Sequence, residues 1–172
     1  MALVPRPLLA AVEALARERA GEPGTRTLAF RNTHTAETLE VAFAAGDLYL
    51  EPGLEAIAWI LRDHRTGDVA PIDPKLLDLL HLLRTEAAGA GERAVFEIIS
   101  GYRSPRSNEA LRQRSGGVAR HSLHMKGMAA DVRLPGVSLV TLRDAALDLK
   151  RGGVGYYAGE FVHVDTGGVR RW

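Results

Sequence analysis

The sequence contains no cysteine among its 172 residues. Disulfide bonds, thiolate metal ligands and a cysteine nucleophile are therefore excluded. An excess of charge of one sign is also lacking, because 22 Lys and Arg residues face 21 Asp and Glu residues and leave a formal net charge of +1. Nucleic-acid-binding proteins usually carry a clear positive excess, so we expect no nucleic-acid partner.

Long hydrophobic runs are absent as well. A membrane-spanning helix needs about 20 consecutive apolar residues, and no run here approaches that length, so no membrane span is predicted. The apolar patch near the N-terminus is interrupted by Pro5, Pro7 and Glu13, which does not favour a signal peptide. Residues 8–20 instead have the apolar spacing of a short amphipathic helix.

What the sequence does have is enough apolar material for one domain of ordinary size. Hydrophobic residues make up 46% of the chain, which is sufficient to build a core. The loop Glu22-Pro23-Gly24-Thr25 separates the leading helix from the rest. We therefore predict an N-terminal extension at residues 1–25, with a short helix, and one folded domain at residues 26–172.

Strand and helix patterns are interspersed along this domain without strict alternation. Strands are predicted at residues 27–32, 38–43, 47–50, 94–100, 129–134 and 161–165. Helices are predicted at residues 53–64, after Asp73-Pro74, after Ser104-Pro105, and from Ser138 to about Lys150. This order favours a single-domain α+β fold, with a mainly antiparallel central sheet and helices packed on it.

The six histidines are the first candidates for metal ligands. His34 falls in a predicted turn, His64 at a helix end and His81 within a helix, where ordinary polar or capping roles are expected. The remaining three, His121, His124 and His163, each lie near a predicted strand and a glycine-rich turn.

His124, Asp131 and His163 form a candidate His-Asp-His metal site. Three protein ligands and one open position are typical of catalytic zinc. Gly127 can bend the segment between the first two ligands, since glycine adopts backbone conformations that other residues avoid. Spacing alone is a weak signal, because a chain with six histidines and many carboxylates offers many such triples.

Sequence motifs strengthen this interpretation. Residues 122–131, SLHMKGMAAD, match the S-x-H-x-x-G-x-A-x-D motif of the zinc D-Ala-D-Ala peptidases, the superfamily that includes the hedgehog fold. Other segments resemble its murein endopeptidase K branch over about residues 26–172. These are NTHT (32–35), LRDHRTGD (61–68), ISGYRSP (99–105), GGVGYY (152–157) and FVHVDTGGVRRW (161–172).

The resemblance implies a hedgehog/D-Ala-D-Ala peptidase-like fold and a metallopeptidase that cleaves murein peptide cross-links through a zinc-activated water. One Zn²⁺ would be held by His124, Asp131 and His163, and Arg103 would bind the substrate. A D,D- or L,D-carboxypeptidase of the same superfamily is one alternative. A non-catalytic murein-binding module that retains the zinc site is another. A murein substrate implies a periplasmic or cell-envelope location, although the sequence carries no convincing signal peptide.

Two carboxylates flank His163 and compete for the role of general base. Residues i and i+2 of a strand share a face, so Asp165 should point to the side of His163. Glu160 has the opposite parity, but relatives in the wider superfamily place a catalytic Glu three residues before this histidine. We predict Asp165 as the base and keep Glu160 as its rival. The alternatives are that Asp165 holds a histidine or arginine in place and that Glu160 is a solvated turn residue.

Three further residues near the candidate site have open roles. His121 is either a proton donor, a residue that supports a metal ligand, or a solvated loop residue, and we favour the last two. Tyr156 and Tyr157 are candidates to line the cleft, although an aromatic pair beside a glycine turn is as often a packing feature.

Overall fold

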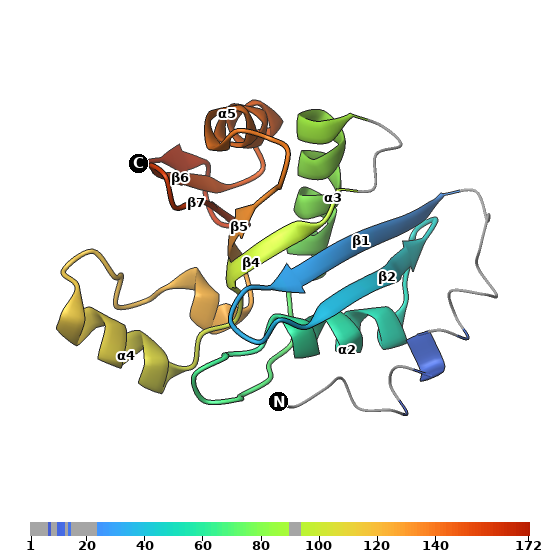
Figure 1. Ribbon diagram of the computed structural model, residues 1–172, viewed down its shortest axis with the longest axis horizontal. Helices are drawn as coiled ribbons and strands as arrows, with labels where there is room; N and C mark the ends of the chain where they lie inside the picture. Colours follow the sequence, from blue (N-terminus) through green and yellow to red (C-terminus); the bar gives the residue numbers. More distant parts are fainter. Residues whose placement is uncertain (1–6, 8–9, 13, 15–23, 90–93) are drawn as a thin grey trace.

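The computed structural model describes residues 7, 10–12, 14, 24–89 and 94–172. The strands are β1 (Thr25–Asn32), β2 (Thr38–Ala45), β3 (Leu48–Tyr49), β4 (Phe96–Ser100), β5 (Ala129–Arg133), β6 (Gly153–Tyr157), β7 (Phe161–Asp165) and β8 (Arg170–Arg171). The helices are α2 (Glu51–Ile60), α3 (Pro74–Ala88), α4 (Pro105–Arg114) and α5 (Leu139–Leu149), with a short 3₁₀ helix η1 (Leu123–Lys126). The α+β prediction is confirmed (Figure 1).

The described strands form a single sheet in the order β3-β2-β1-β4-β5-β7-β6-β8. Strand β1 pairs in parallel with β4, and β6 pairs in parallel with β8. The other neighbouring pairs are antiparallel. The sheet is therefore mainly antiparallel, as predicted, but mixed in detail.

Helix starts follow the predicted caps. Asp73 accepts a hydrogen bond from the Lys75 backbone N–H at 3.0 Å, ahead of Pro74 at the first helical position of α3. Ser138 accepts from the Thr141 N–H at 3.0 Å and begins α5. Helix α4 begins in the same way after Ser104, whose hydroxyl oxygen accepts from a backbone N–H of the first turn at 3.2 Å.

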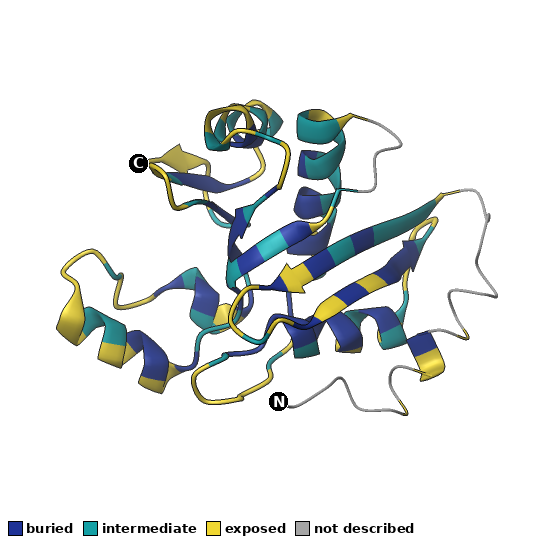
Figure 2. Ribbon diagram, in the orientation of Figure 1, coloured by how far each residue is buried: buried dark blue, intermediate teal, exposed yellow. Residues whose placement is uncertain are grey.

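The hydrophobic core lies between the sheet and three of the helices. Helix α2 packs against β1 and β2, α3 packs against β1 and α5, and α5 packs against β6 and β7. Figure 2 shows the buried residues on these facing surfaces, while α4 projects to one side of the body. The largest fully buried side chains include Phe30, Phe43 and Phe96. The strands of the sheet are therefore supported by a hydrophobic core on the face where these helices pack.

Two segments that the resemblance singled out lie against each other. Gly101, just after β4, approaches Leu61 so closely that an added Cβ would clash with the Leu61 carbonyl. The Tyr102 backbone N–H donates to the same carbonyl oxygen at 2.7 Å. The Ser104 N–H donates to Asp63 at 2.8 Å. Residues 61–68 therefore fix the turn that presents Arg103.

Some sequence predictions were wrong or fall outside the described residues. No strand was predicted at GGVGYY (152–157), but most of this segment forms β6, and the short strand β8 was not predicted either. Gly153 and Gly155 sit in β6 because Arg170 and Trp172 occupy the space that side chains there would need. The predicted helix at residues 8–20 lies largely outside the described residues and stays a prediction.

No helix in the described ranges is both long and apolar enough to cross a membrane.

Candidate metal centre

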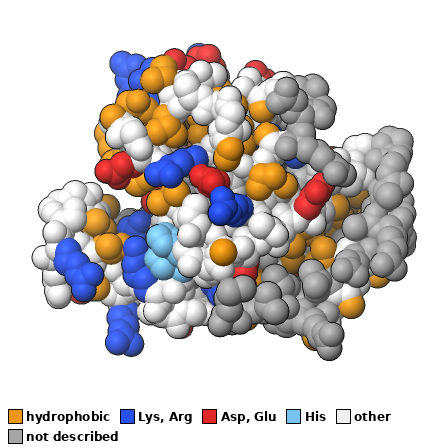
Figure 3. Space-filling view, viewed as in Figure 1, with side chains coloured by type: hydrophobic (Ala, Val, Ile, Leu, Met, Phe, Trp, Pro, Cys, Tyr) orange, Lys and Arg blue, Asp and Glu red, His pale blue; other side chains and the backbone are white. Residues whose placement is uncertain are grey.

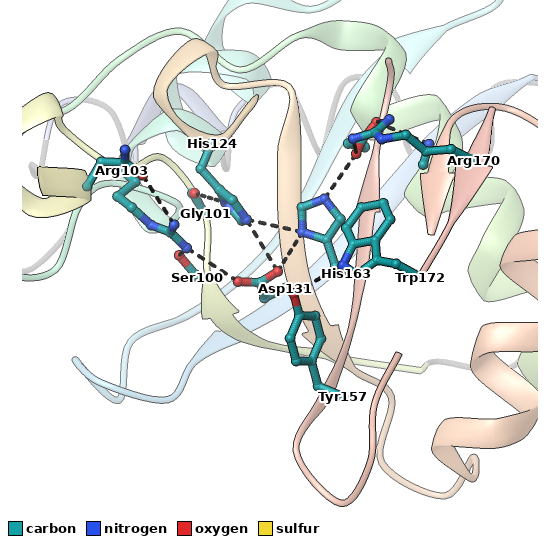
Figure 4. Close-up of polar contacts among 12 residues, drawn as sticks. Ser100, Gly101, Arg103, His124, Asp131, Tyr157, His163, Arg170 and Trp172 are labelled. Atoms are coloured by element: carbon teal, nitrogen blue, oxygen red, sulfur yellow. Dashed lines mark hydrogen bonds and ion pairs between the residues drawn. The ribbon is translucent and has the colours of Figure 1, made fainter. Parts of the chain in front are cut away.

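Three side chains from separate elements converge at one point of the structure. His124 lies in η1, Asp131 on β5 and His163 on β7, where Asp131 and His163 are direct cross-strand partners. Asp131 Oδ1 lies 2.8 Å from His163 Nδ1 and 3.3 Å from His124 Nε2. The two ring nitrogens are 3.2 Å apart. All three side chains are buried. Figure 4 shows them pointing toward one another.

Gly127 brings the first two of these residues together. It ends η1 with a positive φ of 66°, in the left-handed region that favours glycine. An added Cβ would clash with the Pro71 carbonyl oxygen, and the Asp73 N–H donates to the Gly127 carbonyl at 2.9 Å. The chain therefore turns tightly from His124 into β5, as the sequence analysis proposed.

Each imidazole has a hydrogen-bond partner on the side that faces away from the cluster. His124 Nδ1 lies 2.7 Å from the Gly101 carbonyl oxygen, which can only accept, so Nδ1 carries the proton and Nε2 has a free lone pair. His163 Nε2 lies 3.0 Å from Asp165 Oδ2, and its Nδ1 lies 2.8 Å from Asp131 Oδ1, so each of its nitrogens faces a carboxylate oxygen that can accept. Donation from Nε2 to Asp165 would leave the Nδ1 lone pair available to a metal ion. Such contacts are typical of metal-binding histidines.

The electrostatics of the cluster favour a cation. Burial alone would raise the pKa of Asp131, but the neighbouring His124 and His163 outweigh burial and hold that pKa well below its usual range. Burial would lower the pKa of His163, but hydrogen bonds to Asp131 and Asp165 raise it overall. The cluster therefore favours a positive charge, which a metal ion would supply.

The donor set fits zinc. Two imidazole nitrogens and one carboxylate oxygen lie within 4.8 Å of one another, and all three residues are buried. Zn²⁺ prefers nitrogen and oxygen donors of this kind, and catalytic sites keep a further position open. In the described part of the chain, these residues are the group that could hold a metal ion.

Both carboxylate oxygens of Asp165 accept hydrogen bonds from neighbouring groups. Its Oδ1 accepts from the backbone N–H groups of Gly153 at 3.1 Å and Gly167 at 2.8 Å. Arg170 donates to both carboxylate oxygens, at 3.1 Å and 2.6 Å. Burial would raise the pKa of Asp165, but the bonds from His163 and Arg170 hold it well below its usual range. Asp165 shares the side of His163, as strand parity predicted, and contacts the nitrogen that faces away from Asp131.

Glu160 is not brought to the donors. It is exposed in the turn between β6 and β7, where its carbonyl oxygen accepts a hydrogen bond from the Arg133 guanidinium. It is not among the described residues that line the cavity in front of the donors. This position corresponds to the solvated turn residue that the sequence analysis gave as the alternative.

The donors lie at the wall of a cavity of about 430 Å³. Arg103 lines it, as predicted from the turn before α4, with its guanidinium 3.6 Å from Asp131 Oδ2 and 3.4 Å from Ser100 Oγ. His121 also lines the cavity and is exposed. Tyr157 lines it too, whereas Tyr156 does not. Of the two tyrosines, only Tyr157 can meet a molecule bound there.

His34, His64 and His81 lie outside the cluster of metal donors. His34 and His64 stack with ring centroids 3.6 Å apart. Burial lowers the pKa of His64 to about 4, so this ring is neutral near pH 7. His81 Nδ1 lies 3.1 Å from the Thr27 carbonyl oxygen. Figure 3 shows histidine at the surface, flanked by Lys and Arg side chains, beside the lobe that α4 forms.

The parts played by Arg170 and Trp172 were not predicted from the sequence. Arg170 clamps Asp165, and the Trp172 ring lies 5.2 Å from the His163 ring, measured between centroids. Both residues line the cavity. They belong to the end of the chain around β8, which is too short to show periodicity. The only signal was their place in the FVHVDTGGVRRW segment.

Comparisons with known proteins show which family the chain resembles. The family model Peptidase_M15_2, described as "Peptidoglycan L,D-endopeptidase MepK", matches residues 20–172. The peptidoglycan L,D-endopeptidase MepK of Escherichia coli strain K12 is 42% identical over 151 residues, covering 87% of this chain and 81% of the relative. A probable peptidoglycan L,D-endopeptidase MepK of Haemophilus influenzae is 40% identical over 151 residues, covering 87% of this chain and 80% of the relative.

Proposed function

The chain belongs to the peptidoglycan L,D-endopeptidase MepK family, and from this premise we propose that it is a zinc-dependent murein endopeptidase that cleaves peptide cross-links. The observation that carries the proposal is the convergence of His124 Nε2, Asp131 Oδ1 and His163 Nδ1 at the wall of a cavity that Arg103 also lines. A binding module would not need a complete set of ligands beside a positioned arginine.

His124, Asp131 and His163 would hold one Zn²⁺. When bound, zinc supplies a Lewis acid that lowers the pKa of water and polarises a carbonyl group. His124 Nε2 would face the ion with its lone pair, because the Gly101 carbonyl accepts the Nδ1 proton. His163 Nδ1 would do the same once it gives up the proton that it shares with Asp131, while Asp165 accepts from Nε2. The buried Asp131 carboxylate remains ionised because its pKa is held low.

Arg103 would bind the peptide. Its guanidinium lies at the cavity wall beside Asp131, where it can donate to a carboxylate or a carbonyl of the bound strand. A murein peptide offers carboxylates as well as peptide carbonyls as acceptors. A planar guanidinium can bind such a group with two parallel hydrogen bonds.

Asp165 would position His163. Because Gly153, Gly167 and Arg170 all donate to its oxygens, this carboxylate has little freedom to move toward a water molecule in the cavity. We therefore propose the alternative role considered from the sequence, in which Asp165 orients a metal ligand and keeps its ring nitrogen available. Arg170 would in turn hold Asp165 in its ionised form.

The proposed substrate places the protein in the cell envelope. Murein peptides are the cross-linked material of the wall, so a protein that cleaves them must meet them there. This follows from the substrate class, and the periplasmic or envelope location is part of the same proposal.

Product analysis of digested murein tests this function. Purified murein containing both L,D- and D,D-cross-links is incubated with the protein and resolved by mass spectrometry, with the chain carrying His124→Ala as the matched control. We expect L,D-linked dimers to disappear and the corresponding monomers to accumulate in the wild-type digest alone. Release of single terminal amino acids from intact dimers would indicate a carboxypeptidase. Retention on murein without any new product would indicate a binding module.

A further inference from the structure

We propose that Tyr157 is a further catalytic residue, whose hydroxyl donates a hydrogen bond to the carbonyl oxygen of the scissile peptide bond, and that Trp172 positions this hydroxyl. The inference rests on the proposed function and deepens it. Tyr157 ends β6, lines the cavity and is 38% exposed. Figure 4 shows its hydroxyl end directed toward Asp131 and His163.

The direction of the hydrogen bond between Trp172 and Tyr157 determines whether the Tyr157 hydroxyl can donate to a ligand. The Trp172 indole Nε1 lies 3.2 Å from the Tyr157 hydroxyl oxygen. An indole N–H can only donate, so the tyrosine oxygen accepts here and its own proton remains free to be donated elsewhere. Within the described part of the chain, this proton has no acceptor. The hydroxyl therefore presents a donor to whatever occupies the cavity.

The position of Tyr157 is fixed by packing. Its ring stacks on Phe161, its cross-strand partner, with centroids 4.5 Å apart and an interplanar angle of 28°. Trp172 is held at the edge of β6 by two backbone hydrogen bonds, at 3.2 Å to Val154 and at 3.1 Å from Tyr156. A donor fixed in this way needs little reorganisation when charge develops near it.

Gly155 makes the arrangement possible. A Cβ added there would lie 2.7 Å from the Trp172 ring, so the indole lies flat over the place where a side chain would stand. The Arg170 guanidinium covers the indole, 4.9 Å from the ring centroid. Trp172 is therefore packed between Gly155 and Arg170, in contact with both His163 and Tyr157.

Peptide hydrolysis builds up negative charge on the carbonyl oxygen, and a hydrogen-bond donor can stabilise that charge. As water adds to the peptide carbonyl carbon, the electron pair of the C=O π bond moves onto the oxygen. When the C–N bond then breaks, that pair re-forms the carbonyl, and the amine leaves with a proton that came from the water. Tyr157 keeps its proton throughout and only stabilises the charged oxygen. Arg103 is already engaged by Asp131 and Ser100, so a second, neutral donor adds to it.

The first test compares two tyrosines on the same strand. Tyr157→Phe removes the hydroxyl but keeps the ring, and kcat on an L,D-cross-linked dimer should fall on the order of 100-fold. KM should change by less than about threefold and bound zinc should be unchanged, because the donor acts on charge that develops in the transition state. Tyr156→Phe is the control, since Tyr156 packs against Arg143 and lies outside the cavity. It should retain wild-type kcat.

A binding measurement adds a readout that does not depend on turnover. A phosphinate analogue of the cross-link carries a negatively charged oxygen where the carbonyl oxygen would be. By calorimetry, Tyr157→Phe should weaken this analogue on the order of 100-fold while leaving the affinity for the product peptides unchanged. Equal weakening of analogue and products would mean that Tyr157 only shapes the cavity, and would overturn the inference.

The positioning role of Trp172 is tested by a double-mutant cycle. Trp172→Phe keeps an aromatic ring but loses the N–H, and kcat should fall about 10-fold in the wild-type background and hardly at all in Tyr157→Phe. An equal loss in both backgrounds would overturn the positioning role. Wild-type kcat in Tyr157→Phe, with the wild type and Tyr156→Phe both cleaving, would overturn the catalytic role alone. Failure of wild type and Tyr156→Phe to cleave any cross-link would overturn the proposed function and this inference with it.

Discussion

Asp165 Oδ2 lies 3.0 Å from His163 Nε2, on the side of the ring away from Asp131, while the Arg170 guanidinium donates to both oxygens of the same carboxylate. Arg170, Asp165 and His163 thus form a chain of charge-assisted contacts that leads to the cluster. A histidine held in this way presents one nitrogen, in one orientation, to a metal ion. His163 would thus bind the metal directly, whereas Asp165 and Arg170 would hold His163 in place.

Replacing Asp165 by Asn keeps its shape and removes its charge. We expect zinc affinity to fall about 10- to 100-fold, because His163 loses the charged acceptor that orients its ring. Competition against a chromophoric chelator measures this directly. Glu160→Gln is the matched control and should bind zinc and hydrolyse cross-links like the wild type, since Glu160 is exposed in a turn. Loss of hydrolysis in Glu160→Gln, with Asp165→Asn near wild type, would instead support the E-x-x-H arrangement of the wider superfamily.

Removal of a direct ligand should have a larger effect than removal of an outer partner. His124→Ala leaves two donors, so zinc affinity should fall by more than the roughly 100-fold upper range expected for an outer contact. The fold should survive, because the core lies on the other side of the strands. His121→Ala is the control, as His121 lines the cavity without joining the donor cluster. The measurement is the zinc content per chain of both variants at equal protein concentration. Full zinc occupancy in His124→Ala would refute this ligand assignment.

Arg103→Lys keeps the positive charge but loses the planar, forked donor. We expect kcat/KM on a cross-linked muropeptide to fall about 10- to 100-fold with zinc content unchanged. Arg106→Lys, an exposed change in the first turn of α4, controls for a general effect of replacing an arginine there. Wild-type rates in Arg103→Lys would show that this arginine takes no part in binding the peptide.

Two glycines with positive φ separate backbone strain from crowding. Gly127 (φ 66°) and Gly136 (φ 89°) both disfavour a side chain, but only at Gly127 would a Cβ clash with a neighbouring carbonyl. Gly136→Ala should therefore cost about 1 kcal/mol of unfolding free energy, and Gly127→Ala about 1–3 kcal/mol more. Urea unfolding of the zinc-free proteins compares them. Equal destabilisation would mean that the close approach to Pro71 does not constrain the turn.

The parts of the site that lie close together in sequence could be predicted from it. His124, Gly127 and Asp131 fall within eight residues, so one motif and the conformational freedom of glycine were enough to join them. Strand parity also placed Asp165 on the side of His163, and the structure agrees. The helix starts at α3, α4 and α5 were found because each capping side chain bonds to a backbone group within its own first turn.

The contacts that define the role of Asp165 could not be predicted in this way. Its partners Gly153 and Arg170 come from β6 and β8, and they meet only after the sheet has assembled. The packing of Trp172 over Gly155 could not be predicted either, since a glycine in a strand does not indicate which ring will cover it. The parallel pairing of β1 with β4 likewise depends on the whole sheet, not on either strand.

The central claim is that His124, Asp131 and His163 hold one zinc ion that is required to cleave a murein cross-link. The most direct measurement strips the purified protein of metal with a chelator, returns zinc in steps, and follows cleavage of a defined L,D-cross-linked dimer by mass spectrometry. We expect no cleavage without metal and a rise in rate that levels off at about one zinc per chain. Cleavage that persists in the metal-free protein, or none at full zinc occupancy, would contradict it.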